Sequence, residues 1–289
     1  MSKSKVYFTK TITSDSVVEM FKILNKELSG KVAVKVHSGE KGNQNYLHPE
    51  FLREMIEYVK GTVVECNTAY EGARNTTDKH KKLIEDHGWT KYFDVDIMDS
   101  DGPDLELNIP HGKVINKNYL GKNITKYDSM LVISHFKGHP MGGYGGALKQ
   151  LSIGCASSYG KAYIHGAGVP EDIWTADHDK FLESMADAAS SIVEYFDNNI
   201  AYINIMCNMS VDCDCCAKAE DPCMKDIGIL SSLDPVALDQ ACIDLIYNSN
   251  DPGKNHLIER IESRNGTHTI ECSEKLGIGS KNYELIIVD

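Results

Sequence analysis

Short β-branched runs alternate along the chain with segments of helical periodicity, and this alternation restricts the folds that the chain can adopt. Eight runs have the length and composition of strands, namely residues 6–9, 31–37, 62–66, 93–97, 130–134, 201–206, 227–230 and 283–288. Strands that alternate with helices build largely parallel sheets with helices on both faces. We therefore predict an α/β, Rossmann-like fold.

The segments between these runs indicate where helices begin and how the chain is divided. Apolar residues recur at helical spacing in residues 17–28, 51–58, 177–196 and 234–246. Asp234 can cap the last of these helices, and Pro235 suits its first position. The polar stretch at residues 116–126 is the best candidate for a boundary. We expect subdomains at residues 1–125 and 126–289, with a crevice between them.

A glycine-rich segment directly follows the run at residues 130–134. It holds four glycines between histidines and a lysine, namely Gly142, Gly143, Gly145 and Gly146. Glycine lets backbone N–H groups approach an anion without interference from Cβ, and it adopts positive φ freely, which we expect at Gly145. The start of a following helix would add partial positive charge. The sequence thus predicts an anion-binding loop that contacts a cofactor or a substrate.

Three side chains around this loop are the catalytic candidates. His139 precedes a proline and the glycine turn, and a histidine there can move protons or bind a metal. Lys149 lies among small and apolar residues, where its ammonium would meet an anion. His165 is a candidate because of its spacing from Lys149.

A cysteine cluster is the second chemical feature. Its four thiols lie within eleven residues and belong to Cys213, Cys215, Cys216 and Cys223. They can reach one soft metal or an iron–sulfur cluster if the chain loops around it. Cys213 and Cys215 are the best pair, because alternate side chains of an extended segment point the same way. Alternatively, the cysteines pack as small hydrophobic groups or form a redox-active pair.

Both features follow expected strands, and ligands of open α/β sheets bind beyond the carboxyl ends of the strands. We therefore expect His139 and Cys213 to face one crevice. The net charge of −12 argues against nucleic acid or an anionic membrane as the main partner, and no apolar run is long enough to span a bilayer. Nine unevenly spread cysteines favour reduced thiols. We expect a cytoplasmic protein whose pocket binds a small anion.

Six motifs, at residues 34–40, 65–70, 134–139, 142–149, 212–215 and 226–239, give the chain a family resemblance. It resembles domain of unknown function family 362, whose members are described as uncharacterised iron–sulfur-centre proteins. The resemblance implies metal or iron–sulfur chemistry. Many members carry a ferredoxin-like insertion after the region that matches His165. This chain lacks the insertion, so the implied metal would fall on the cysteine cluster.

The spacing of His139, Lys149 and His165 is similar to that in nickel-pincer lactate racemases. In that family the lysine holds the nickel-pincer nucleotide covalently, the later histidine binds nickel and the earlier one exchanges the substrate proton. The resemblance implies these roles for Lys149, His165 and His139. That family's other catalytic histidine has no clear counterpart in residues 67–75.

These observations leave three functions open. The first is a metalloprotein with redox or iron–sulfur chemistry and an anion-binding loop. The second is a racemase or isomerase of a small hydroxy acid that depends on a metal cofactor. The third is a non-catalytic carrier of a metal or cofactor.

Overall fold

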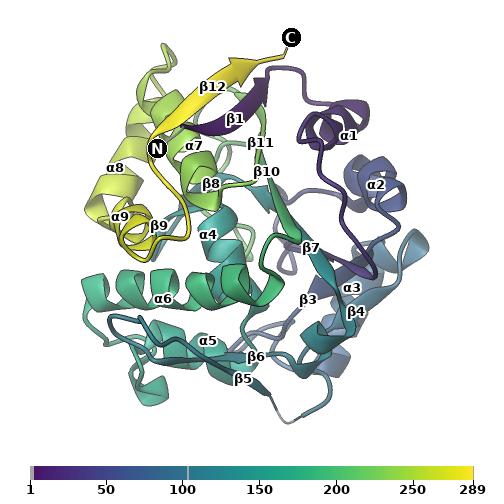
Figure 1. The fold of residues 1–289 in the computed structure, drawn as a ribbon, viewed down its shortest axis with the longest axis vertical. Helices are drawn as coiled ribbons and strands as arrows, with labels where there is room; N and C mark the ends of the chain where they lie inside the picture. The colour runs from purple at the N-terminus through teal and green to yellow at the C-terminus, as the bar shows by residue number, and fades with distance from the viewer. Residues whose placement is uncertain (1–2, 103, 289) are drawn as a thin grey trace.

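The computed structural model describes residues 3–102 and 104–288, and one sheet of eight strands runs through this part of the chain. The strand order is β12-β1-β11-β10-β7-β2-β3-β4 (Figure 1). The strands are β1 (Ser4–Thr9), β2 (Val32–Lys35), β3 (Thr62–Glu65), β4 (Val95–Ile97), β7 (Ser129–His135), β10 (Ile200–Met206), β11 (Gly228–Ser232) and β12 (Tyr283–Ile287). Each lies at one of the eight predicted runs.

Most neighbouring strands are parallel, as predicted. The pairs β10–β7, β7–β2, β2–β3, β3–β4 and β1–β12 are parallel, whereas β11 is antiparallel to both β10 and β1. The carboxyl ends of the five strands from β10 to β4 therefore meet at one edge. The sheet continues across the boundary expected at residue 126, because β2 pairs with β7. The division into two subdomains stays a prediction.

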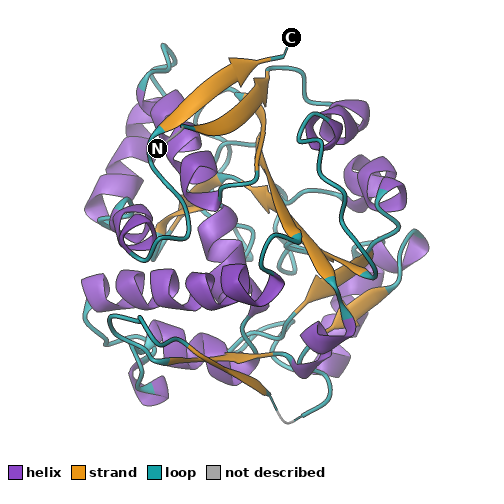
Figure 2. Ribbon diagram, viewed as in Figure 1, coloured by secondary structure: helices purple, strands orange, loops and turns teal. Residues whose placement is uncertain are grey.

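Helices cover both faces of the sheet (Figure 2). One face carries α1 (Ser14–Lys22), α2 (Pro49–Tyr58) and α3 (Thr77–Asp86). The other carries α4 (Ala147–Lys149), α5 (Ser158–His165), α6 (His178–Phe196), α7 (Pro235–Tyr247), α8 (Lys254–Ser263) and α9 (His268–Lys275). Short turns of helix lie at η1 (Trp89–Lys91), η2 (Lys122–Lys126), η3 (Gln150–Gly154) and η4 (Pro170–Asp172).

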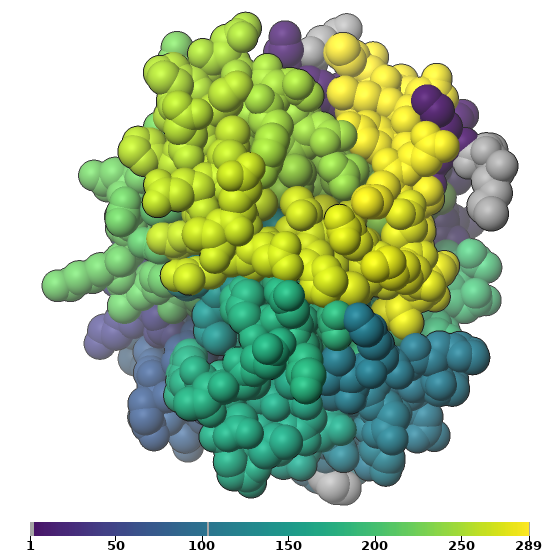
Figure 3. Space-filling model, turned by 90° about the vertical axis from the view of Figure 1, so that its left-hand side faces the viewer, coloured from purple at the N-terminus to yellow at the C-terminus, as the bar shows by residue number. Residues whose placement is uncertain are grey.

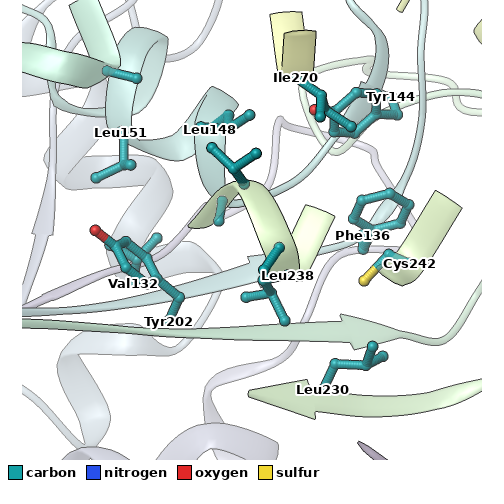
Figure 4. Close-up of a cluster of buried hydrophobic side chains, with 14 of the residues drawn as sticks. Val132, Phe136, Tyr144, Leu148, Leu151, Tyr202, Leu230, Leu238, Cys242 and Ile270 are labelled. Carbon is teal, nitrogen blue, oxygen red and sulfur yellow. The ribbon is translucent and has the colours of Figure 1, made fainter. Parts of the chain in front are cut away.

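Alternation along the central strands supplies the two hydrophobic cores. In β7, Leu131 and Ile133 pack with α1 and α2, whereas Val132 packs on the side of α4 and α7. Figure 4 shows the second core, where Val132, Tyr202 and Leu238 lie close together. Burying each large apolar side chain contributes about 1.5–3 kcal/mol. The parallel strands are buried on both faces, which explains their continuous apolar runs.

The ends of two helices illustrate what the local sequence decides. Asp234 accepts hydrogen bonds from the backbone N–H groups of Val236 and Ala237, both at 2.9 Å, so α7 begins where the sequence predicts. Helix α1 is shorter than predicted. It ends at Lys22, and Asn25 follows with φ 48° in the left-handed region.

Two small hairpins were not predicted, and one of them builds the glycine-rich segment. Strands β5 (Leu105–Asn108) and β6 (Lys117–Leu120) form the first, and β8 (Lys137–His139) and β9 (Gly143–Gly145) form the second. The turn of the second hairpin requires glycine at position 143, where φ is 78°. Gly145 does not have positive φ, so our expectation for that residue is wrong. Within the described residues, every helix is too short or too polar to cross a membrane.

Candidate functional site

A cavity of about 310 Å³ lies beyond the carboxyl ends of β2, β3 and β7. Its walls are completed by β8, β9, α4, α5 and the cysteine loop. The lining includes seven of the predicted site residues, namely His139, Lys149, His165, Gly145, Gly146, Cys213 and Cys215. The expectation that His139 and Cys213 face one crevice is therefore confirmed.

His139 is held in one orientation by the turn that follows it. Its Nδ1 accepts hydrogen bonds from the N–H groups of Met141 at 3.1 Å and Gly142 at 2.9 Å. Burial and the nearby charge of Lys149 keep the pKa of His139 well below its ordinary value, so the ring is neutral. A neutral ring whose Nδ1 accepts must carry its proton on Nε2. That Nε2 lies 3.7 Å from the Cys215 sulfur.

Cys213 and Cys215 are joined by a disulfide bond. The N–H of Cys215 also donates to the Cys213 sulfur at 3.1 Å. Asn43 fixes the loop, because its side-chain amide donates to the carbonyl groups of Cys213 and Cys216. The two sulfurs and the His139 Nε2 lie within 4.8 Å of one another, and this group could hold a metal. Both sulfurs would have to be reduced first, because thiolates are the metal ligands.

The other two predicted thiol ligands lie outside the cavity lining. Cys223 is half-buried, and its thiol donates to the Met209 carbonyl at 3.2 Å. Cys216 is also half-buried, and its backbone N–H donates to the Cys213 carbonyl at 3.0 Å. A site with all four thiols on one metal stays a prediction.

The charge of the cavity is predominantly positive. Five cationic side chains line it, whereas Glu65 and Asp214 are the two lining carboxylates. The cations are Lys35, Arg74, Lys137, Lys149 and Lys161. The net charge of the whole chain is −12, so this local excess of positive charge is opposite in sign to the charge of the molecule as a whole.

Three of these cations form buried ion pairs. Lys35 contacts Glu65 at 2.7 Å, and Arg74 contacts Glu40 at 3.1 Å. Lys137 contacts Asp214, which also accepts from the His135 Nδ1 at 3.1 Å. Burial raises the pKa of Asp214, but the charges of His135 and Lys137 more than offset this and hold it well below its ordinary value.

Lys149 and Lys161 have no ion-pair partner in residues 3–102 and 104–288, and Lys161 instead donates to the Ala156 carbonyl at 2.6 Å. Burial, with the neighbouring charges of Arg74 and Lys35, lowers the pKa of Lys149 to about 8. The side chain therefore stays largely protonated at neutral pH but loses its proton more readily than an exposed lysine. It is a cation in position to meet an anionic ligand.

His165 is the last residue of α5, and its ring stacks on Phe181 with the centroids 4.8 Å apart. Burial, together with the charges of Lys149 and Lys161, lowers the pKa of His165 to about 3. Its buried Nδ1 has no hydrogen-bond partner among the described residues. His165 is thus a neutral ring with unused hydrogen-bonding capacity at the cavity.

The backbone of the glycine-rich segment is partly engaged. Asp239 accepts from the N–H groups of Ala147 at 2.8 Å and Leu148 at 3.0 Å, at the start of α4. The N–H groups of Met141 and Gly142 point to His139. Gly142 and Gly143 are not part of the cavity lining. Anion binding by this backbone stays a prediction.

The cavity also contains residues that the sequence did not indicate as site residues. Arg74 is buried in its wall and His37 is half-buried there, and Tyr70 and Trp174 lie with rings 6.2 Å apart. Trp174 is 64% exposed although it lines the cavity. Only their place in loops that follow strands β2 and β3 could have indicated His37, Tyr70 and Arg74.

Comparison with known proteins identifies the family. The sequence model described as Domain of unknown function (DUF362) matches residues 32–244, and the chain belongs to this family. No curated protein matches the chain.

Two solved structures resemble the chain at low identity. The lactate racemase apoprotein from Thermoanaerobacterium thermosaccharolyticum has 15% identity and a TM-score of 0.42, over 69% of this chain and 50% of that chain. A protein from Thermotoga maritima has 12% identity and a TM-score of 0.45, over 92% of this chain and 60% of that chain. The chain thus spans one half and three fifths of their lengths.

Proposed function

We propose that this family member is a metal-dependent enzyme that transfers a proton on a small anionic substrate. The observation that carries the proposal is the content of one cavity. It combines two cysteine sulfurs, two neutral histidines and a lysine without an ion-pair partner among the described residues. Family membership and the cysteine–histidine group both fit a metal-related protein.

The anionic group of the substrate binds at Lys149. Its ammonium stands among other cations, and a carboxylate or phosphate would relieve their mutual repulsion. Arg74 and Lys161 also line this cavity and add positive charge. A charge-assisted hydrogen bond to an anion is stronger than one between neutral groups. The proposal therefore assigns Lys149 to binding and orienting the substrate.

The metal is a single soft ion held by the reduced sulfurs of Cys213 and Cys215. Two thiolates would supply soft ligands and offset the charge of a dication in this positive cavity. His139 is less suited as a third ligand, because two backbone N–H groups place its proton on Nε2. When bound, such an ion acts as a Lewis acid that polarises an oxygen of the substrate.

The two histidines differ in how they can take part in proton transfer. His139 presents Nε2–H and can donate a hydrogen bond to negative charge that develops on the substrate, whereas the His165 ring is neutral and can accept a proton. A racemase or isomerase needs a base and a group that stabilises the resulting anion at one cavity. This pair favours that reaction class over a non-catalytic carrier, which would need no proton-transferring groups.

A second candidate is a dithiol–disulfide oxidoreductase, favoured by the bond between Cys213 and Cys215. A dithiol substrate would attack one sulfur, form a mixed disulfide and leave as its own disulfide. The two cysteines would take up the two electrons and end as thiols. The Nε2–H of His139, 3.7 Å from Cys215, could donate a hydrogen bond that stabilises the departing thiolate.

Metal analysis of reduced protein separates these candidates. Wild type, Cys213→Ser/Cys215→Ser and Cys223→Ser are purified anaerobically with a reductant, and the bound metal per chain is measured. We expect metal in wild type and in Cys223→Ser but not in the double variant. Loss in Cys223→Ser would instead indicate the four-thiol cluster. Metal-free wild type that undergoes reversible two-electron reduction would contradict the metal enzyme and support the oxidoreductase.

A further inference from the structure

A second group of metal-binding side chains lies away from the cavity, where α9 packs against α6. It consists of Glu183 from α6 and of His268 and Cys272 from α9. The His268 Nε2 lies 3.0 Å from Glu183 Oε1 and 3.6 Å from the Cys272 sulfur. In Figure 3 the yellow C-terminal helices meet the teal part of the chain along a seam, on the face turned to the viewer.

The helices place these three side chains together. His268 and Cys272 are four residues apart, so they project from one side of α9. Thr269 donates from its hydroxyl to the Leu182 carbonyl at 3.4 Å, which ties α9 to α6 beside Glu183. Ile270 and Phe181 are buried. The backbones that carry the three ligands are therefore held by packing rather than by a mobile loop.

The distances suit a tetrahedral ion. Zinc binds histidine nitrogen, cysteine sulfur and carboxylate oxygen at about 2.0–2.3 Å, so tetrahedral ligand atoms stand roughly 3.3–3.8 Å apart. The separations of 3.0 and 3.6 Å from His268 Nε2 to Glu183 Oε1 and to the Cys272 sulfur are close to this spacing. Three protein ligands would leave a fourth position for water.

His268 has the ring orientation that a metal ligand needs. Its Nε2 points to the other two ligands, and its Nδ1 lies 4.0 Å from Glu271 Oε2. The ring proton can therefore stay on Nδ1, facing a carboxylate, while Nε2 offers its lone pair. His139 lacks this freedom, because its Nδ1 accepts two backbone N–H groups.

A positive charge already occupies part of this group. The Lys113 ammonium contacts Glu183 Oε1, and the Lys113 side chain is 62% exposed. An exposed lysine can swing into solvent when a dication arrives, so it competes with the ion without blocking the site.

We propose that Glu183, His268 and Cys272 form a binding site for a zinc-class transition-metal ion. This site is separate from the cavity and does not depend on the function proposed for it. The chemistry of the ligands, one nitrogen, one sulfur and one oxygen, fits zinc or cobalt better than magnesium or calcium, which prefer oxygen alone.

The test uses full-length Cys213→Ser/Cys215→Ser protein, so that the cavity thiols cannot contribute. Reduced protein is titrated with Co²⁺, and the d–d and sulfur-to-cobalt absorption bands are followed, with Zn²⁺ as competitor. We expect one ion per chain with a sulfur band that Zn²⁺ abolishes. In this background Cys272→Ser should remove the sulfur band, and Glu183→Gln should weaken binding by about tenfold or more.

Two further variants sharpen the result. Lys113→Ala should strengthen Co²⁺ binding, because the competing ammonium is gone. His256→Ala, which removes an exposed histidine of α8, should bind as the parent does. Circular dichroism confirms that each variant is folded. Folded parent protein without a sulfur band, or a band that persists in Cys272→Ser, would overturn the proposal.

Discussion

The two walls of the cavity differ in how their cationic side chains are neutralised. On the wall formed by strands, Lys35 of β2 pairs with Glu65 of β3, and Lys137 of β8 pairs with Asp214. On the wall formed by helices, Lys161 of α5 donates to the Ala156 carbonyl at 2.6 Å. Lys149 of α4 has no ion-pair partner among the described residues.

This difference separates charges that serve the fold from a charge that is free for a ligand. Burial raises the pKa of Glu65, but Lys35 and His37 more than offset this, so the carboxylate stays charged. Burial lowers the pKa of Lys149 to about 8, and further cations add to this effect. A buried pair is costly to break, whereas Lys149, a half-buried cation, gains stability when an anion binds.

The largest expected effect comes from breaking a pair on the strand wall. Lys137→Met should lower the free energy of unfolding by about 3–5 kcal/mol, because Asp214 would keep its buried charge without the ammonium. Urea unfolding of wild type and variant measures this. The matched variant Lys149→Met should change stability by less than about 1 kcal/mol. Equal losses in the two variants would remove the distinction between the walls.

Anion binding should depend on Lys149, the lysine whose replacement is expected to change stability little. Lys149→Ala should weaken binding of phosphate or a small carboxylate by about 1–3 kcal/mol, since a charge-assisted hydrogen bond is lost. Calorimetric titration of the reduced protein measures the affinity. Lys81→Ala serves as control, because it removes an exposed lysine that is distant from Lys149 in the sequence. Unchanged affinity in Lys149→Ala would assign anion binding to another group.

The pH dependence of binding should report Lys149 directly. Its pKa of about 8 means that the ammonium is lost as pH rises through 8. Sulfate keeps its charge over this range, so its affinity should fall by roughly tenfold per pH unit well above that pKa. Lys149→Arg should bind sulfate with little change, because a guanidinium stays protonated. A flat profile in wild type would show that the lysine charge does not contribute.

The smallest expected effect lies at Gly145, the last residue of β9, close to the helix wall. A Cβ on Gly145 would meet Lys149 Cδ at 4.0 Å, which is an ordinary contact. Gly145→Ala should therefore change the free energy of unfolding by no more than about 0.5 kcal/mol. A Cβ on Gly146 would lie 2.5 Å from Asp239 Oδ1, so Gly146→Ala should cost about 1–3 kcal/mol. Thermal unfolding of both variants compares these values.

Much of the fold was predictable, because strands and helices follow local periodicity. All eight predicted runs lie at strands of the main sheet, and α7 begins at Pro235 as its capping residue indicates. The family resemblance is confirmed by the match over residues 32–244. The hairpin β8–β9 was missed, since its three-residue strands are too short and too rich in glycine for a periodic signal.

The candidate site was predictable in part. His139, Lys149, His165, Cys213 and Cys215 were all indicated by unusual local sequence, and all five line the cavity. The group of Glu183, His268 and Cys272 left no such signal, because Glu183 is 85 residues away from His268 in the chain. Arg74 was not selected because an arginine in a polar loop is ordinary until its burial is known.

The sequence by itself determined the order of strands and helices and the presence of reactive side chains in the loops after strands. These properties depend on neighbours within a few residues, which the sequence displays directly. Only the tertiary structure decided that Lys137 has an ion-pair partner, that Lys149 has none within the described part of the chain, and that His139 turns its proton toward Cys215. Such properties depend on burial and on charges from distant segments, and they arise only when the chain has folded.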